Sequence, residues 1–268
     1  MTRTALLLAT TIGIGTTAAI TTAGSAVPHR RVLFVGNSLT YTNDLPATVG
    51  AIARSTGDTM TIVTAVAPNL ALIDHLTGGS DAVRQLKNNR WDVVVLQQGP
   101  TSSAGVCRDS LVLWTRMFDS LVRPNGGRTA LFMTWPARSQ GDVWTGVRTS
   151  YQVATQAVDG VFLPAGEAWH IALRQHPGLP LYGPDGFHPS PMGSYLAALE
   201  IYERLSDRDA RTVPSQAFQA GVPLVMSVDT IRWLQQAAHE ANASYPASPT
   251  ETASAPAARR QTTGNTGC

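Results

Sequence analysis

The sequence is poor in charge and in cysteine. Charged residues make up 14% of the 268 residues, and Lys+Arg 20 against Asp+Glu 18 leave a formal net charge of +2. No basic run is present, so a nucleic-acid-binding protein is not expected, because such proteins need a dense basic surface. The two cysteines, Cys107 and Cys268, are too few for a cysteine metal site. The sequence does not decide whether the two cysteines bridge each other. Cys268 can equally stay free or pair with another molecule.

Two further patterns are missing. No glycine-rich phosphate loop follows a predicted strand, and no compact cluster of ligands has the spacing of a known metal site. Asp185, His188 and His170 can be imagined as ligands, but their spacing matches no such pattern. We therefore expect neither a metal nor a cofactor.

One apolar stretch stands apart at the start of the chain. It covers residues 5–20, follows the lone positive charge of Arg3, and ends in the small residues Gly24-Ser25-Ala26. This pattern is typical of a secretory signal peptide cleaved near Ala26. A membrane anchor is the alternative, but threonine and glycine interrupt the stretch and it is short for a span. We expect a secreted protein with residues 1–26 removed and no stable membrane insertion.

The rest of the chain alternates between strand and helix patterns. Apolar runs rich in β-branched residues predict strands, and residues apolar at helical spacing predict helices. Alternation of this kind predicts a three-layer α/β/α domain, flavodoxin-like, with a mostly parallel sheet of about five strands. The domain is expected over 27–243, and the tail 244–268, rich in Thr, Ser, Ala, Pro and Gly, is expected to be disordered. The predicted strands are 32–35, 60–66, 92–96, 129–133 and 160–163, and the predicted helices are 45–55, 70–76, 81–87, 109–122, 143–157, 166–175, 192–205 and 229–242.

The first predicted strand ends in a turn that carries a serine. The apolar run 32–35 stops at Gly36, and Asn37 and Ser38 follow. In open parallel sheets, ligands and active-site residues lie beyond the carboxyl ends of the strands. Ser38 is therefore a candidate nucleophile, and the alternative is that it only caps the helical turn after it.

An acid and an imidazole lie three residues apart far downstream. Asp185 and His188 belong to the Pro/Gly-rich segment 177–188, directly before a predicted helix. A serine hydroxyl is a weak nucleophile and needs a base, and an aspartate can orient that base. We expect His188 to be the base and Asp185 its partner.

These two blocks resemble the SGNH/GDSL hydrolase superfamily. Gly36-Asn37-Ser38-Leu39 is similar to its first block, and Asp185-x-x-His188 to its last, with about 150 residues between them. The resemblance covers roughly residues 31–205. It implies a serine hydrolase in which Ser38, His188 and Asp185 form a triad, with Asp185 less important than His188.

The two middle blocks depart from the family pattern. The family places a glycine after the second strand and an asparagine after the third as oxyanion donors. Here Asn69 and Leu70 follow the second strand, and Gln97 and Gln98 follow the third. The resemblance to glutamine-bearing branches implies an oxyanion hole made by the backbone N–H of Ser38, an amide of Asn69 or Leu70, and the side chain of Gln98 in preference to Gln97. Either glutamine is equally compatible with ordinary strand-end hydrogen bonding.

The expected function is a secreted serine esterase acting on a small-molecule or carbohydrate ester, with short acyl groups, acetyl among them, suggested by the resemblance. A secreted glycan- or cell-wall-binding protein with little turnover is the first alternative, and a lipase or phospholipase the second. A glutamine donor aimed at Ser38 favours catalysis, and a glutamine turned into the core favours binding. Trp135, at the end of the fourth predicted strand, is a candidate for a pocket wall or for the core. We expect a monomer.

Overall fold

A five-stranded parallel sheet forms the centre of the computed structural model, which describes residue 1 and residues 29–99 and 105–246. The strands lie in the order β2-β1-β3-β4-β5. The first strand, β1, is therefore an inner strand, and later strands lie on both sides of it. Every neighbouring pair is parallel. The bounds of the strands are β1 Arg30–Gly36, β2 Met60–Val66, β3 Val93–Leu96, β4 Arg128–Phe132 and β5 Val161–Leu163.

Alternate side chains of each strand enter two separate cores. Val32 and Phe34 of β1 pack on one face of the sheet, and Leu33 and Val35 pack on the other. All four are fully buried, as expected for a strand covered on both sides. Each such side chain contributes on the order of 1.5–3 kcal/mol when it leaves water.

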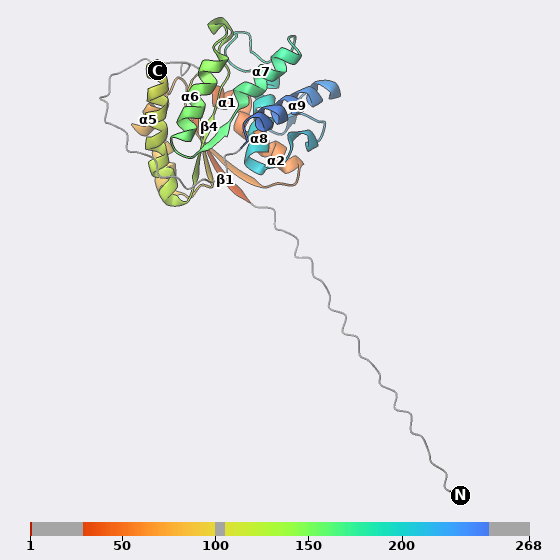
Figure 1. Cartoon of the computed structure of the whole chain (residues 1–268), viewed down its shortest axis with the longest axis horizontal. Coiled ribbons are helices and arrows are strands. Elements are labelled where there is room, and N and C mark those ends of the chain that lie inside the picture. The colour runs from red at the N-terminus through yellow and green to blue at the C-terminus, as the bar shows by residue number, and fades with distance from the viewer. Residues whose placement is uncertain (2–28, 100–104, 247–268) are drawn as a thin grey trace.

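Helices cover both faces (Figure 1). The first face carries α2 (Leu45–Ser55), α7 (Ala165–Gln175), α8 (Pro191–Ser206) and α9 (Val228–Ser244). The second carries α3 (Leu72–Leu76), α4 (Ala82–Asn88), α5 (Gly105–Val122) and α6 (Trp144–Gln156). The result is a three-layer α/β/α domain, which confirms the fold class expected from the sequence.

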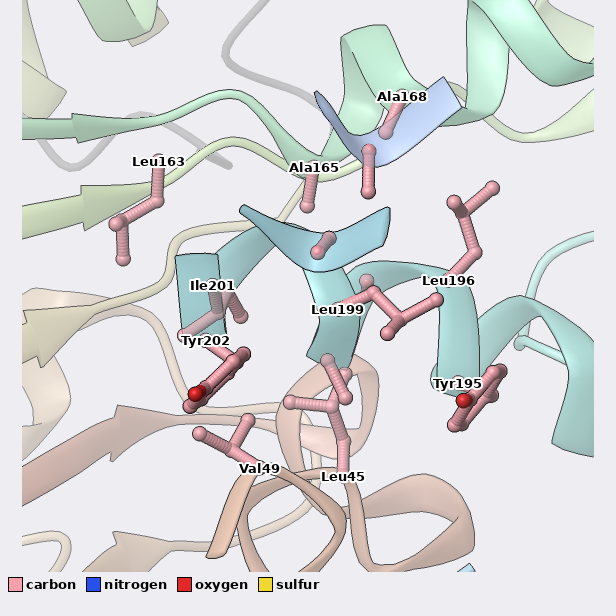
Figure 2. Packing of buried hydrophobic residues seen from close by; sticks show 14 of the residues in the cluster. Leu45, Val49, Leu163, Ala165, Ala168, Tyr195, Leu196, Leu199, Ile201 and Tyr202 are labelled. Carbon is pink, nitrogen blue, oxygen red and sulfur yellow. The ribbon is translucent and has the colours of Figure 1, made fainter. Parts of the chain in front are cut away.

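The contact between α2 and α8 joins the start of the chain to its end (Figure 2). Leu45 and Val49 of α2 point toward Leu199 and Tyr202 of α8, and all four side chains are buried. The hydroxyl group of Tyr202 also donates to Asp58, just beyond α2, over 2.7 Å. This packing brings the segments that carry Ser38 and His188 to the same end of the sheet.

The predicted elements match the structure closely, with a few differences. The helix predicted over 109–122 begins four residues earlier, at Gly105. A short helix directly after β1 and a small hairpin, β6 (Phe218–Gln219) with β7 (Val222–Pro223), had no counterpart in the prediction. The two-residue strands of the hairpin are too short to show a period. No helix in the described ranges is long and apolar enough to cross a membrane.

Several expectations from the sequence concern residues outside the described part of the chain. The signal peptide 1–26 lies outside the described residues apart from Met1, and the tail does so from residue 247 onward. The prediction left open for Cys107 and Cys268 also stays a prediction, because Cys268 lies outside the described part.

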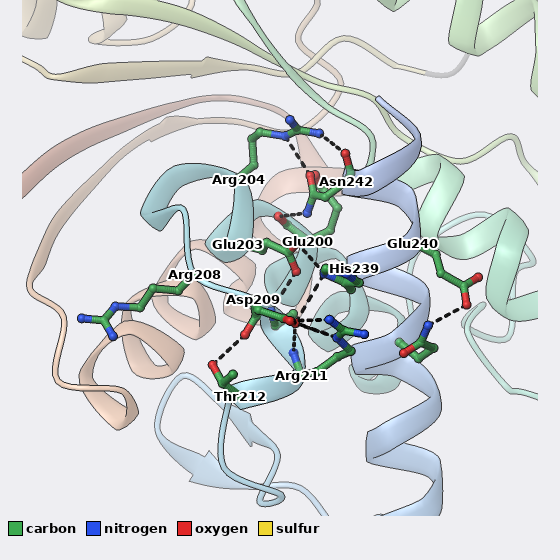
Figure 3. A network of polar contacts seen from close by, with 12 residues as sticks. Glu200, Glu203, Arg204, Arg208, Asp209, Arg211, Thr212, His239, Glu240 and Asn242 are labelled. Carbon is green, nitrogen blue, oxygen red and sulfur yellow. Dashed lines mark hydrogen bonds and ion pairs between the residues drawn. The ribbon is translucent and has the colours of Figure 1, made fainter. Parts of the chain in front are cut away.

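A polar network links the end of α8 to α9 (Figure 3). His239 Nδ1 lies 3.0 Å from Glu203 Oε1 and 3.4 Å from Asp209 Oδ1. The acids are shared with other donors, because Arg211 pairs with Asp209 at 2.6 Å and the N–H of Ala210 donates to Glu203. The network therefore joins α8, α9 and the short helix Ala210–Thr212, whose charges it satisfies internally.

Glu200, one helical turn before Arg204, is buried in a different way. Its side chain is fully enclosed, and neither carboxyl oxygen has a hydrogen-bond partner among the described residues. Burial raises its pKa well above the ordinary value, and the positive charge of Arg204 only partly opposes this effect. The group therefore stays protonated at a pH at which an exposed glutamate is ionised.

We expect Glu200→Gln to flatten the pH dependence of stability. Because the folded-state pKa is raised, the folded protein holds a proton that the unfolded chain releases, and stability falls as pH rises from the ordinary glutamate pKa to the raised one. The slope in that window approaches about 1.4 kcal/mol per pH unit. Urea midpoints at pH 5, 7 and 9 measure it. Glu240→Gln, whose carboxylate accepts bonds from Gln175 and Gln236, is the control, and equal slopes in both variants would refute the expectation.

Candidate active site

Ser38 begins the short helix α1 (Ser38–Tyr41) directly after β1. The turn between them needs glycine at position 36. A Cβ atom there would lie 2.4 Å from Thr40 Oγ1 and 2.6 Å from Gln97 Oε1, distances that no real side chain tolerates. Gly36 therefore lets β1 end beneath the helix, with Ser38 beyond the carboxyl end of the sheet.

Asn37, not Ser38, caps α1. Its side-chain oxygen accepts the backbone N–H of Leu39 at 3.2 Å, which satisfies a donor at the start of the helix. The capping role considered for Ser38 is thus filled by its neighbour. The hydroxyl group of Ser38 is left to meet a different partner.

That partner is His188. Ser38 Oγ lies 2.9 Å from His188 Nε2, and His188 Nδ1 lies 2.6 Å from Asp185 Oδ2. The structure thus joins the three residues in one chain of hydrogen bonds, although 150 positions separate Ser38 from His188. With Nδ1–H donating to the carboxylate, Nε2 is the acceptor that faces the serine hydroxyl.

Asp185 is fixed as an anion. The hydrogen bond from His188 is the main cause that lowers its pKa to about 2, and the backbone N–H groups of Phe187 and His188 add to the effect. Its side chain is 49% exposed and that of His188 is 36% exposed. Solvent therefore screens the charge interaction of the pair.

A neighbouring loop supports the segment that carries Asp185 and His188. The indole N–H of Trp135 donates to the carbonyl of Phe187 at 3.1 Å, and the backbone N–H of Arg138 donates to that of Gly186 at 2.8 Å. Trp135 is fully buried and stacks on Trp169 with ring centroids 3.7 Å apart. Of the two roles considered for Trp135, the structure shows the core, not a pocket wall.

Two segments next to the serine turn carry backbone N–H groups without an acceptor among the described residues. In the described ranges, the N–H groups of Ser38, Asn69 and Leu70 have no hydrogen-bond acceptor. The loop that carries Asn69 and Leu70 is tied to the serine turn, because Asn37 Nδ2 donates to the carbonyl of Leu70 at 3.1 Å. Asn69 has a left-handed backbone with φ of 60°. These donors have the chemistry of an oxyanion hole.

The two glutamines lie below this region. Gln98 accepts the N–H of Leu72 through its side-chain oxygen at 2.8 Å, so it supports the Asn69–Leu70 loop from β3. Gln97 accepts the N–H of Asn37 at 2.9 Å and the hydroxyl of Thr40 at 2.8 Å. Because a backbone N–H can only donate, the oxygen of Gln97 must face the turn. Gln97 is therefore an acceptor that supports the turn, not the donor that it was considered to be as the alternative to Gln98.

Neither glutamine side chain is accessible: Gln97 is 1% and Gln98 2% exposed. The amide nitrogen of Gln97 is enclosed and meets no acceptor among the described residues. By the criterion set from the sequence, Gln97 turned into the protein does not favour catalysis. The backbone N–H groups of Ser38, Asn69 and Leu70 therefore remain the candidate oxyanion donors.

The histidine considered as a third metal ligand lies elsewhere. His170 stacks on Trp144 and lies 3.9 Å from Glu167, and no hydrogen bond joins it to His188 in the described part. The described residues do bring Glu203, Asp209 and His239 together. Arginine and backbone donors already occupy those acids (Figure 3), so we assign no metal there.

Sequence reasoning missed what Asn37 does. It makes three contacts, to Leu39, Leu70 and Gln97, and so joins the ends of β1, β2 and β3. The signal was available in part, because asparagine directly before a helical turn is a favoured cap. Its contacts with the other two strand ends depend on the sheet order, which local patterns do not contain.

Comparisons with known proteins agree on the architecture. Neither a family model nor a curated protein matches the sequence. Among solved structures, a DUF4886 family protein from Bacteroides uniformis is similar with a TM-score of 0.68 and 19% identity over 84% of this chain and 98% of that one. A protein from Slackia heliotrinireducens assigned to the SGNH hydrolases has a TM-score of 0.56 and 23% identity over 66% of this chain and 100% of its own.

The acetyl xylan esterase AlAXEase is a third similar structure, with a TM-score of 0.50 and 14% identity over 66% of this chain and 98% of that one. At these identities the likeness establishes the fold. The chain has the fold of the SGNH hydrolases.

Proposed function

We propose that this protein is a serine hydrolase of carboxylic esters. The observation that carries the proposal is the hydrogen-bonded chain Ser38–His188–Asp185, with distances of 2.9 and 2.6 Å, at the carboxyl end of the sheet. A hydroxyl paired with an imidazole that is itself oriented by a carboxylate is the arrangement that makes serine nucleophilic. The SGNH-hydrolase fold supports the same reading.

The reaction follows from the positions of these groups. Ser38 Oγ attacks the carbonyl carbon of the ester while its proton passes to His188 Nε2. The carbonyl oxygen becomes an oxyanion, which accepts hydrogen bonds from the N–H of Ser38 and from the Asn69–Leu70 loop. The intermediate expels the alcohol, which takes the proton from His188. Water, deprotonated by His188, then attacks the acyl-serine, and the carboxylic acid leaves as Ser38 recovers its proton.

Short acyl groups on a carbohydrate are the substrate we propose. The support is the resemblance of the glutamine-bearing blocks and the likeness of the fold to an acetyl xylan esterase. Export, proposed from the apolar stretch that begins the sequence, would place the protein beside extracellular polymers. A lipase acting on long chains is the alternative within the same chemistry.

A binding protein with little turnover is the second candidate function. The buried side chains of Gln97 and Gln98 favour it, because the structure does not place the amide of Gln97 in front of Ser38. The backbone donors of Ser38, Asn69 and Leu70 favour catalysis. Turnover decides between the two.

The purified mature protein should hydrolyse p-nitrophenyl acetate and butyrate, and Ser38→Ala should remove this activity. We expect kcat/KM to fall from acetate to palmitate if the acyl group is short, and to rise toward palmitate if the protein is a lipase. Labelling of Ser38 by a fluorophosphonate measures the nucleophile without the deacylation step. A protein that neither turns over any ester faster than Ser38→Ala nor is labelled would overturn the esterase, and glycan binding would then be measured.

His188 and Asp185 should differ in importance. We expect His188→Ala to lower kcat by about 10²–10⁴, the usual contribution of a general base. Asp185→Ala should cost less, about tenfold to a hundredfold, because water can enter the space of a carboxylate that is half exposed and accept the Nδ1–H of His188. With a pKa of about 2, Asp185 is ionised at every pH above about 3, so the wild-type kcat profile from pH 4 to 9 should contain no step from this group. A larger loss in Asp185→Ala than in His188→Ala would contradict the assignment.

A further inference from the structure

The segment after Ser38 has an unusual backbone. Residues Thr42–Asp44 form a single 3₁₀ turn between α1 and α2, and within it Asn43 and Asp44 have φ of 57° and 51°. Left-handed conformations disfavour residues with a Cβ, although asparagine and aspartate tolerate them best. Two in succession are retained only where surrounding contacts determine the conformation.

The side chain of Asn43 supplies such contacts, and they lie on the histidine segment. Its Nδ2 donates to the carbonyl of Pro189 at 2.9 Å and to the hydroxyl oxygen of Ser194 at 2.9 Å. Ser194, on the first turn of α8 and 1% exposed, donates in return to the carbonyl of Thr42 at 3.3 Å. We call Asn43, Ser194 and these two carbonyl groups the clamp.

The clamp joins the two halves of the candidate active site. Within the described residues, four hydrogen bonds connect segment 37–44 with segment 182–194. One is the bond between Ser38 and His188, and the other three all belong to the clamp. Pro189, whose carbonyl Asn43 binds, directly follows His188. The packing of α2 on α8 brings the segments together, and the clamp acts within a few residues of both reacting side chains.

We propose that Asn43 is a positioning residue that sets the separation between Ser38 and His188. The proposal rests on the proposed function for its kinetic consequence. A misplacement of about 1 Å in a catalytic pair can cost about a hundredfold in rate. The left-handed backbone of Asn43 is what directs its amide at Pro189, so the strain in the turn serves this contact.

Asn43→Gly and Asp44→Gly form a matched pair that tests the proposal. Both place glycine at a left-handed position of the same turn, and only the first removes the clamp donors. We expect Asn43→Gly to lower kcat for p-nitrophenyl acetate and the rate of fluorophosphonate labelling of Ser38 by about tenfold to a hundredfold. The KM should stay within about twofold, because the clamp does not touch the substrate. Asp44→Gly should stay within about twofold of the wild type in both parameters.

Two further variants separate positioning from general stabilisation. Asn43→Asp keeps the side-chain shape but loses the N–H donors, so it should lose activity as Asn43→Gly does. Ser194→Ala should lose less by itself, and its effect should not add to that of Asn43→Gly, because both act through one group of contacts. Urea midpoints of the Asn43→Gly and Asp44→Gly proteins should agree. An activity loss accompanied by a matching loss of stability would indicate a structural role and overturn the proposal.

A crystal structure of Asn43→Gly gives a readout that needs no turnover. We expect the separation of Ser38 Oγ and His188 Nε2 to exceed 3.5 Å, the limit of a hydrogen bond, against 2.9 Å with the clamp intact. A longer separation in a protein that hydrolyses no ester would support the clamp while the proposed function fails. An unchanged separation, or a kcat within twofold of the wild type, would overturn the clamp and leave the esterase standing.

Discussion

The hydrogen bond between Ser38 and His188 is the contact on which the functional reading depends. It joins residues 150 positions apart, and neither segment makes it alone. The inner strand β1 leads to the serine, and the loop before α8 carries the histidine. The sheet order, with β1 inside and later strands added on both sides, and the packing of α2 on α8 together bring these ends of the sequence to one place. The domain between these segments thus holds Ser38 Oγ within hydrogen-bond distance of His188 Nε2.

Local patterns predicted the elements well because their physical causes are local. Buried parallel strands such as β3 consist of four consecutive apolar residues, Val93–Leu96, and a run of this kind has few other interpretations. The helices α2 and α8 begin and end near residues that favour those positions. The hairpin β6–β7 was missed because strands of two residues contain no period. The short helix at Ser38 was missed because four residues are too few for a helical pattern.

The candidate site was less predictable than the fold, for a reason that Gln97 illustrates. Residue type shows that a glutamine has both a donor and an acceptor, and it does not show which one faces a given neighbour. In the structure the N–H of Asn37 points at Gln97 and thereby selects its oxygen. Asn43 is a second case, since its partners Pro189 and Ser194 lie about 150 residues away. The spacing in the sequence was enough to predict the pair Asp185 and His188, because both lie on one loop. It contains no information about contacts between different loops.

The exposure of the acid and the base has a consequence for what can approach them. Asp185 and His188 lie on the loop before α8, with 49% and 36% of their side chains open to solvent. The stacked rings of Trp135 and Trp169 support this loop. Side chains this open to solvent can meet a bond that is attached to a large body, because such a bond does not need to enter a deep channel. For the esterase proposed above, this exposure suits ester side groups along a polymer as well as a freely diffusing ester.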